Sequence, residues 1–233
     1  MASGWSGLQI QAKAGESFGL YGTKWKRNPD GEFIINANTG LREVETGKFI
    51  GSIYPDWTMG IANSFNYKGF NLSFLIDIRQ GGVIYSSTTA SLRSGGLAEE
   101  TLANRGGIFI DKGVISNGDG TYRANDIPVQ SMQDFWGQYS ASSNTEGSVF
   151  DASYIKLREI SFSYSLPSKL VKKLNIQGVE FGVEARNLWI IKDHVPHIDP
   201  ESNMYGSNSA AEGVEFNGVP STKSIGFNLK LKF

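Results

Sequence analysis

The residues best suited to metal chemistry lie together in one polar stretch. His194, His197, Asp199 and Glu201 follow one another with the spacing His-x-x-His-x-Asp-x-Glu. This spacing does not match a zinc pattern, and Pro196 breaks any helix that could align the four side chains. The stretch therefore favours a polar loop, and we predict no metal there.

No other pattern predicts catalysis, because no Ser/His/Asp arrangement or paired-carboxylate motif stands out. Gly81-Gly82 and Gly95-Gly96 lack the strand-to-helix context of a phosphate-binding loop and indicate turns. The chain has no cysteine, which excludes disulfides and thiolate metal sites. Its net charge of −1 gives no electrostatic reason to expect nucleic acid. We predict no enzymatic activity, no cofactor and no nucleic-acid partner.

Aromatic residues in the presumed external loops are the better candidates for binding. Tyr85, Trp136, Tyr139 and Tyr205 could stack on sugar rings or pack against a partner protein. The alternative is that they hold the loops together, and the dominance of large aromatic residues in packing favours this alternative. Both interpretations stay open at this point.

The last residues of the chain indicate the elements that must position these loops. Ile225, Phe227, Leu229, Leu231 and Phe233 alternate strictly with Gly226, Asn228, Lys230 and Lys232. This period of two gives an extended strand one apolar and one polar face. A transmembrane β-barrel explains the pattern, because one face meets lipid, the other meets the lumen, and closure removes the sheet edge. The residues Phe227, Leu229, Leu231 and Phe233 also resemble the signal by which outer-membrane barrels are recognised for assembly.

Further strands of this kind are predicted along the chain. With 28 glycines and 12% aromatic residues, the composition favours β structure with many turns. Near Arg158-Glu159 the apolar phase slips by one residue, which predicts a β-bulge. We predict about six long strands. Ser17–Lys26 is predicted from its glycine and aromatic residues, and alternation predicts the others: Trp57–Tyr67, Phe70–Tyr85, Asp151–Ser165, Gln177–Ile191 and Lys223–Phe233.

The lengths of the connections support the membrane interpretation. They alternate strictly between long (27–55, 80–149, 192–219) and short (68–69, 166–175). A transmembrane barrel has short periplasmic turns on one side and long extracellular loops on the other. The fold class we predict is all-β: a partial antiparallel transmembrane β-barrel.

Several motifs resemble those of the SusC/RagA-type TonB-linked outer-membrane transporters, in family order from about residue 17 to Phe233. One resembles the strand-opening motif near the family's C-terminus, and others match its earlier hairpin and its next strand and loop. They are Asp151-Ala152-Ser153-Tyr154-Ile155-Lys156-Leu157-Arg158-Glu159-Ile160, Tyr54-Pro55-Asp56-Trp57, Tyr67-Lys68-Gly69-Phe70, Asp77-Ile78-Arg79-Gln80-Gly81-Gly82, Arg186-Asn187-Leu188-Trp189 and Ile198-Asp199-Pro200-Glu201.

The resemblance implies a barrel of about 22 strands with an N-terminal plug domain. It implies nutrient import across the outer membrane of a Gram-negative bacterium of the Bacteroidota type, powered by the TonB complex. The implied partners are a SusD-like surface lipoprotein acting as a lid, outer-membrane lipid, the barrel-assembly machinery, and an oligosaccharide or peptide cargo. Residues 1–233 would be the C-terminal barrel segment, without the plug and the N-terminal strands.

Two other classes remain as alternatives. One is a soluble all-β carbohydrate-binding module with aromatic platforms, and the other is a non-transporting outer-membrane barrel such as an adhesin. The start, Met1 to Trp5, has no signal-peptide pattern, which favours a piece of a longer protein. Because a barrel segment has open edges and an apolar face, we expect residues 1–233 alone to need detergent.

Overall fold

The computed structural model describes residues 7–15, 18–140, 143–171, 176–204 and 212–233. The chain forms two compact units, each assembled from segments far apart in the sequence. Unit 1 comprises Met1–Tyr54, Gly82–Asp151 and Val195–Val219, and unit 2 comprises Pro55–Gly81, Ala152–His194 and Pro220–Phe233.

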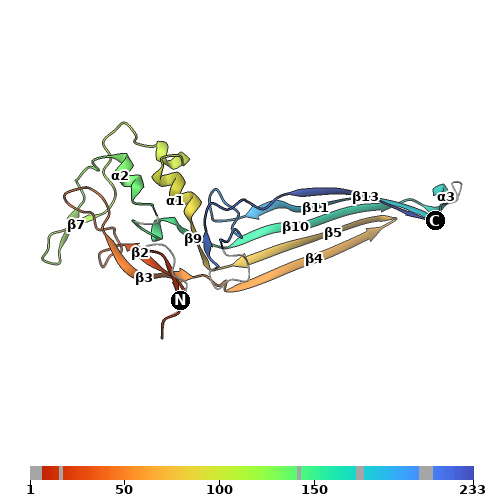
Figure 1. Cartoon of the computed structure of the whole chain (residues 1–233), viewed down its shortest axis with the longest axis horizontal. Coiled ribbons are helices and arrows are strands. Elements are labelled where there is room, and N and C mark those ends of the chain that lie inside the picture. The colour runs from red at the N-terminus through yellow and green to blue at the C-terminus, as the bar shows by residue number, and fades with distance from the viewer. Residues whose placement is uncertain (1–6, 16–17, 141–142, 172–175, 205–211) are drawn as a thin grey trace. The chain divides into compact units, whose positions relative to one another are not determined.

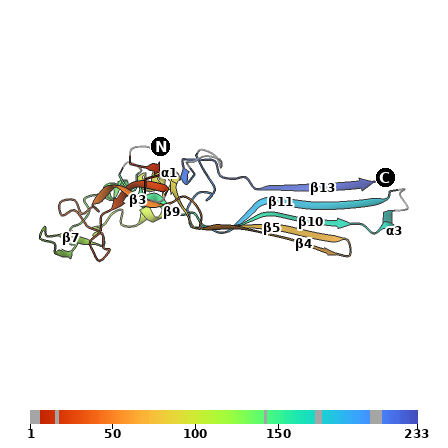
Figure 2. The same cartoon turned by 90° about the horizontal axis from the view of Figure 1, so that it is seen from below.

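Unit 2 contains one five-stranded sheet in which all neighbouring strands are antiparallel (Figures 1 and 2). The strand order is β13-β11-β10-β5-β4, which confirms the antiparallel neighbours predicted from the sequence. The strands are β4 (Trp57–Tyr67), β5 (Phe70–Gln80), β10 (Tyr154–Ser165), β11 (Gly178–Lys192) and β13 (Ser224–Lys232).

The hairpin between β4 and β5 is closed by the predicted two-residue turn. Lys68 and Gly69 both have positive φ angles, 47° and 89°. Turns of this conformation match the right-handed twist of the flanking strands. In the resulting register, Tyr67 pairs with Phe70. Because directly paired residues share a face, the apolar positions of the two strands lie on the same side of the sheet.

The predicted β-bulge lies in β10 and keeps its apolar residues in phase. The register of β10 against both β5 and β11 skips Arg158 between Leu157 and Glu159. Leu157 pairs with Ile76, and Ile160, three residues later, pairs with Phe74, which is two residues before Ile76 in the antiparallel strand β5. The extra residue therefore brings the two apolar runs of β10 onto one face.

Two strand predictions are corrected. β5 ends at Gln80 rather than Tyr85, because Gly81 and Gly82 have φ angles of 81° and 82°, which few other residues adopt. The expected strand Ser17–Lys26 does form, as β2 (Gly19–Trp25), but it belongs to a sheet of unit 1. The sheet of unit 2 thus has five long strands rather than about six.

Unit 1 consists of shorter sheets and helices. Its sheets are β1-β2-β3, β12-β6-β9 and the hairpin β7-β8. The additional strands are β1 (Gln9–Gln11), β3 (Val44–Ser52), β6 (Val83–Ser86), β7 (Val114–Ser116), β8 (Tyr122–Ala124), β9 (Val149–Asp151) and β12 (Val214–Glu215).

Short helices follow hydroxyl caps. The Ser86 hydroxyl accepts the Thr89 N–H at the start of α1 (Ser87–Ser94). Ser131 does the same for Asp134 in α2 (Met132–Gly137). Such caps satisfy backbone donors that a helix leaves free. The remaining helical turns are η1 (Glu99–Leu102), η2 (Glu146–Ser148) and α3 (Ser168–Val171), the last in unit 2.

The core of unit 1 draws on all three of its segments. Leu8, Leu20 and Ile53 come from the first segment, Tyr85 from the second and Val214 from the third, all buried in one apolar cluster. The stretches predicted as separate long loops therefore fold together around a shared core. The sequence did not predict this assembly.

Candidate functional site

One face of the unit 2 sheet is apolar across all five strands. Within the described part of this unit no second sheet covers it. Ile225, Phe227, Leu229, Leu231, Phe181, Val183 and Phe162 are exposed, whereas Ile160 and Val179 are partly exposed. The face is formed, strand by strand, by Trp57, Met59, Ile61, Phe65, Tyr67, Phe70, Leu72, Phe74, Ile76, Ile78, Ile155, Leu157, Ile160, Phe162, Tyr164, Val179, Phe181, Val183, Ala185, Ile225, Phe227, Leu229 and Leu231.

The predicted residues of the terminal strand lie on or beside this apolar face. Phe227 pairs with Val183, Leu229 with Phe181 and Leu231 with Val179. Phe233 follows the last residue of β13 and is exposed. These contacts agree with the predicted alternation of the strand, while a role in barrel assembly stays a prediction.

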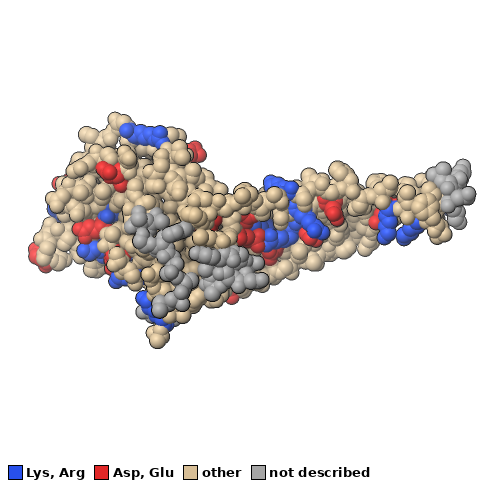
Figure 3. Space-filling model, in the orientation of Figure 1, with Lys and Arg blue, Asp and Glu red and all other residues tan. Residues whose placement is uncertain are grey.

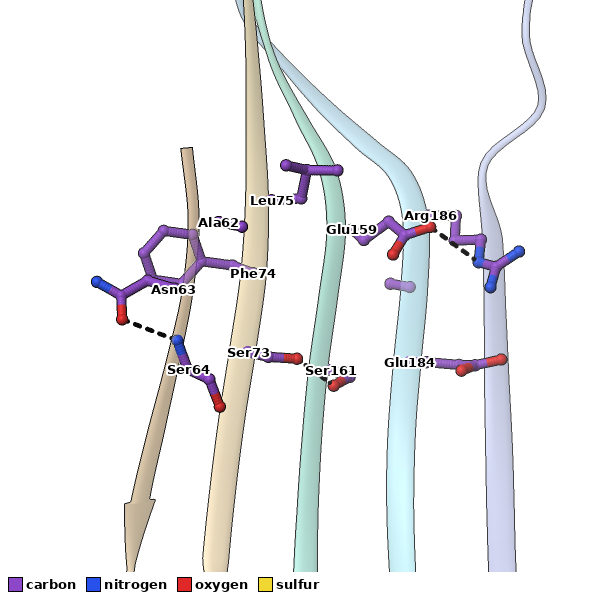
Figure 4. A pocket seen from close by; sticks show the side chains of 11 residues that line it. Ala62, Asn63, Ser64, Ser73, Phe74, Leu75, Glu159, Ser161, Glu184 and Arg186 are labelled. Atoms are coloured by element: carbon purple, nitrogen blue, oxygen red, sulfur yellow. Dashed lines mark hydrogen bonds and ion pairs between the residues drawn. The ribbon is translucent and has the colours of Figure 1, made fainter. Parts of the chain in front are cut away.

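The opposite face of the same sheet is polar and carries small side chains at its centre. Ser73 and Ser161 lie opposite each other with their hydroxyl oxygens 2.8 Å apart, and Asn71 donates to Ser163 at 3.3 Å. A hollow of about 510 Å³ opens over this region and is also lined by Glu184. Figure 4 shows Ser73, Ser161 and Glu184 on the neighbouring strands β5, β10 and β11.

Charged pairs flank the small polar residues. The Arg158 guanidinium, placed by the bulge, donates to Asp77 at 2.6 and 2.9 Å, and Arg186 lies 3.5 Å from Glu159. Charged side chains gather along the sheet in the space-filling view (Figure 3). These partly exposed pairs contribute about 0–1 kcal/mol each. Their main consequence is a water-compatible face on the side opposite the apolar one.

Unit 1 carries an aromatic cluster that includes two of the predicted contact residues. The Trp136 and Tyr139 rings are 5.3 Å apart, and Phe135 lies 5.2 Å from Trp136. Tyr139 also packs edge-on against Trp25 at 5.7 Å. Both Trp136 and Tyr139 remain partly exposed. They thus hold the unit together while leaving part of each ring accessible.

Two arginines bind the aromatic cluster to its surroundings. The Arg42 guanidinium lies 4.0 Å from the Phe33 ring centre and donates to Asp111 at 2.6 and 3.0 Å. Burial disfavours the charged form of Arg42, but the hydrogen bond to Asp111 and the interactions with Tyr139 and the Asp111 charge together outweigh it, so the pKa of Arg42 is raised. Arg93 lies 5.3 Å from the Tyr139 ring, and its hydrogen bond lowers the pKa of Glu100.

A second hollow of about 510 Å³ lies beside Arg42. Asn36, Gln138 and Ser143 also line it, so its wall is rich in amide and hydroxyl groups. Arg42 is paired with Asp111, and Glu43, which also lines the hollow, is paired with Lys26. The hollow therefore offers hydrogen bonds without a strong net charge.

The structure does not support a contact role for Tyr85 and does not describe Tyr205. Tyr85 is 0% exposed and lies in the core of unit 1, where burial raises its pKa well above the usual range. Its ring has no free face for a sugar or a partner protein, so we no longer propose a contact role for it. Tyr205 lies outside the described residues.

The stretch that contains His194, His197, Asp199 and Glu201 forms turns. The Asp199 carboxylate accepts the Glu201 N–H at 2.9 Å, and its backbone carbonyl accepts the Ser202 N–H at 2.8 Å. Throughout the part of the chain that the structure describes, no group of three or more His, Cys, Asp or Glu side chains could hold a metal ion. In the same residues, no helix is long and apolar enough to cross a membrane.

Comparison with known proteins points to one class. No family model matches the chain. It is 28% identical over 212 residues to TonB-dependent receptor P3 of Formosa agariphila, covering 88% of this chain and 19% of that protein. TonB-dependent receptor P26 of the same organism is 26% identical over 200 residues, with 83% and 18% covered. The chain therefore spans about a fifth of the length of these relatives.

Solved structures support the same class at the level of the fold. The RagAB peptide importer in its closed-closed state matches with a TM-score of 0.57 and 17% identity, covering 93% of this chain and 23% of that one. Its open-open state gives a TM-score of 0.58, 18% identity, and coverage of 93% and 22%. The chain is similar to part of a TonB-dependent receptor of the SusC/RagA type, which confirms the resemblance carried by its motifs.

Sequence reasoning missed the polar contacts that organise unit 1. Arg42 and Asp111 are 69 residues apart, and Ser86 and the buried Glu215 are 129 apart. No local motif marks either pair. The one available signal was a charged residue between apolar neighbours, as Glu215 is between Val214 and Phe216.

Proposed function

We propose that this chain forms part of the wall of an outer-membrane, TonB-dependent nutrient importer, in the C-terminal barrel segment of a longer receptor. The observation that carries the proposal is the five-stranded antiparallel sheet with one polar face and one face that is apolar on all five strands, interrupted in β4 by Asn63. In this function the apolar face meets lipid and the polar face lines the lumen.

Strand length and connectivity support this role. The five strands are 9 to 15 residues long, and about 9–11 tilted residues cross a bilayer. β4 and β13 are the outer strands of the sheet. Further strands of the longer receptor would pair with both and close a barrel of about 22 strands. The long connections gathered in unit 1 would be extracellular, and the short turns periplasmic.

The two rival functions fit these observations less well. A soluble carbohydrate-binding module would bury its apolar residues beneath a second layer, yet Phe227 is 82% exposed. An outer-membrane adhesin would share the two-faced sheet. It is disfavoured because the relatives are named receptors and a peptide importer.

Partners and cargo follow from the same proposal. A TonB complex would supply energy through parts of the receptor outside this chain, and the barrel-assembly machinery would insert it into the membrane. A SusD-like lipoprotein would cover unit 1 as a lid. We propose an oligosaccharide as the cargo, with a peptide as the alternative that the naming of RagAB as a peptide importer supports.

An uptake assay in the source organism tests the proposal. Deleting the gene that contains this sequence should abolish uptake of one cargo class, supplied as fluorescent oligosaccharides or fluorescent peptides. Restoring the gene should recover it, and dissipating the proton-motive force should stop uptake in the restored strain. Undiminished uptake of both classes after deletion, or a product found only in the soluble fraction, would contradict the proposal.

The partly exposed aromatic residues give a residue-level prediction. Trp136→Ala and Tyr139→Ala should each lower uptake or lid binding about two- to tenfold, because an aromatic contact contributes about 0.5–1.5 kcal/mol beyond its burial. The amount of receptor in the membrane should stay the same. Tyr122→Ala is the control, since this tyrosine of β8 lies outside the aromatic cluster. Equal effects of all three substitutions would argue for a general loss of folding.

A further inference from the structure

Glu215 is a buried carboxylate at the place where the segments of unit 1 meet. It is 1% exposed and belongs to β12, which pairs in parallel with β6. Its oxygens accept hydrogen bonds from the Ser86 hydroxyl at 3.0 Å, the Thr88 hydroxyl at 2.7 Å and the Thr88 N–H at 3.1 Å. The Gly218 N–H adds a fourth at 3.0 Å. These donors replace the water that a buried carboxylate would otherwise require.

Three of the four donors, provided by Ser86 and Thr88, come from a different segment of unit 1. Ser86 is the N-cap of α1, and Thr88 lies in its first turn. The positive end of the helix dipole therefore meets the carboxylate. Glu215 thus fixes the third segment, Val195–Val219, onto the second, Gly82–Asp151.

The first segment meets the same junction through Gly213. This residue has a φ of 88°, and a Cβ atom there would lie 2.6 Å from the Ile53 side chain. The Gly213 carbonyl accepts the Tyr85 N–H at 2.8 Å. Residues 53, 85 and 213 belong to the three different segments of unit 1. The stretch around Gly213, in the third segment, therefore contacts both of the other segments.

We propose that Glu215 couples the three segments of unit 1, so that they open as one cooperative body rather than as three independent loops. The reason is that releasing Glu215 leaves four donors without their acceptor, among them the buried Ser86 hydroxyl and the partly buried hydroxyl and N–H of Thr88. Releasing β12 also removes Val214 from the core shared by Leu20 and Tyr85. Local openings that share buried contacts are cooperative. This coupling does not depend on what the protein transports.

Amide hydrogen exchange of the complete receptor in detergent tests the coupling. Glu215→Ala should raise exchange about tenfold or more in three stretches together: β2 of the first segment, residues 84–89 of the second, and 212–218 of the third. Glu99→Ala, an exposed acid of η1 in the same unit, is the matched control and should change none of them. A rise confined to residues 212–218 would overturn the proposal.

Milder variants keep the test decisive if Glu215→Ala does not fold. Thr88→Val removes one donor and preserves shape, and Glu215→Gln preserves one acceptor oxygen. Each should raise exchange in the same three stretches by a smaller factor. Gly213→Ala perturbs the junction without touching the carboxylate and should give the same pattern. Three unrelated patterns from these variants would show that the segments open independently.

Discussion

Replacing Phe227 by arginine should destabilise the receptor in a bilayer by about 2–4 kcal/mol, the cost of a cation near the middle of a lipid-facing strand. Phe227 is 82% exposed on the apolar face and lies near the centre of β13. The loss should appear as a lower midpoint in urea titrations of the receptor folded in lipid vesicles, and as less receptor in the outer-membrane fraction.

The adjacent residue provides the control. Asn228 pairs with Gly182 on the polar face, so Asn228→Arg should change the stability by only about 0–1 kcal/mol, because a lumen-facing charge stays hydrated. The two variants add the same charge one residue apart. If Asn228→Arg proved the more damaging, the assignment of lipid and lumen faces would be reversed. Equal effects would argue against a membrane-spanning sheet.

Removing the Asp111 carboxylate should open the aromatic cluster of unit 1. The Arg42 and Asp111 side chains are only 14% and 6% exposed. Asp111→Ala would leave the Arg42 guanidinium buried without its partner, and breaking such pairs costs about 3 kcal/mol or more. Tryptic cleavage after Arg42 should therefore accelerate roughly a hundredfold, since cleavage of a protected site follows the population of its open form.

Two further variants separate the buried charge from other effects. Asp111→Asn keeps an acceptor for Arg42 and should accelerate cleavage less. Asp126→Ala breaks the Arg123–Asp126 pair, whose side chains are largely exposed, and should leave cleavage after Arg42 unchanged. If Asp111→Ala had no effect, the aromatic contacts alone would suffice to hold Arg42 in place.

The sequence by itself determined the two-faced strands of unit 2. A period of two decides which side chains share a face as soon as a segment is extended, so Phe227 and Asn228 could be assigned to opposite faces without a structure. Local patterns also predicted the Lys68-Gly69 turn, because it connects two alternating runs, and the bulge at Arg158, because the alternation slips there by one residue. The alternation of long and short connections was likewise visible from residue spacing alone.

Only the tertiary structure decided how the long connections pack. Tyr85 has the residue type of an exposed binding platform, but the meeting of three segments makes it part of a core. Likewise, the first predicted strand, Ser17–Lys26, was expected from its glycine and aromatic residues to be one of the long strands, yet β2 pairs with β1 and β3. Periodicity fixes the face of a residue and not the partner that covers it.

The residues of the candidate site also differ in whether the sequence could identify them. Trp136 and Tyr139 were identified by their type and their place in a long loop, whereas Arg42, Asp111 and Glu215 were not. The side chains that form hydrogen bonds with these charged residues lie 69 or more residues away. Their burial is stable because those partners supply the hydrogen bonds that water would otherwise provide. These partners come together only once the chain has folded, so no local sequence pattern predicts the burial of the three charged residues.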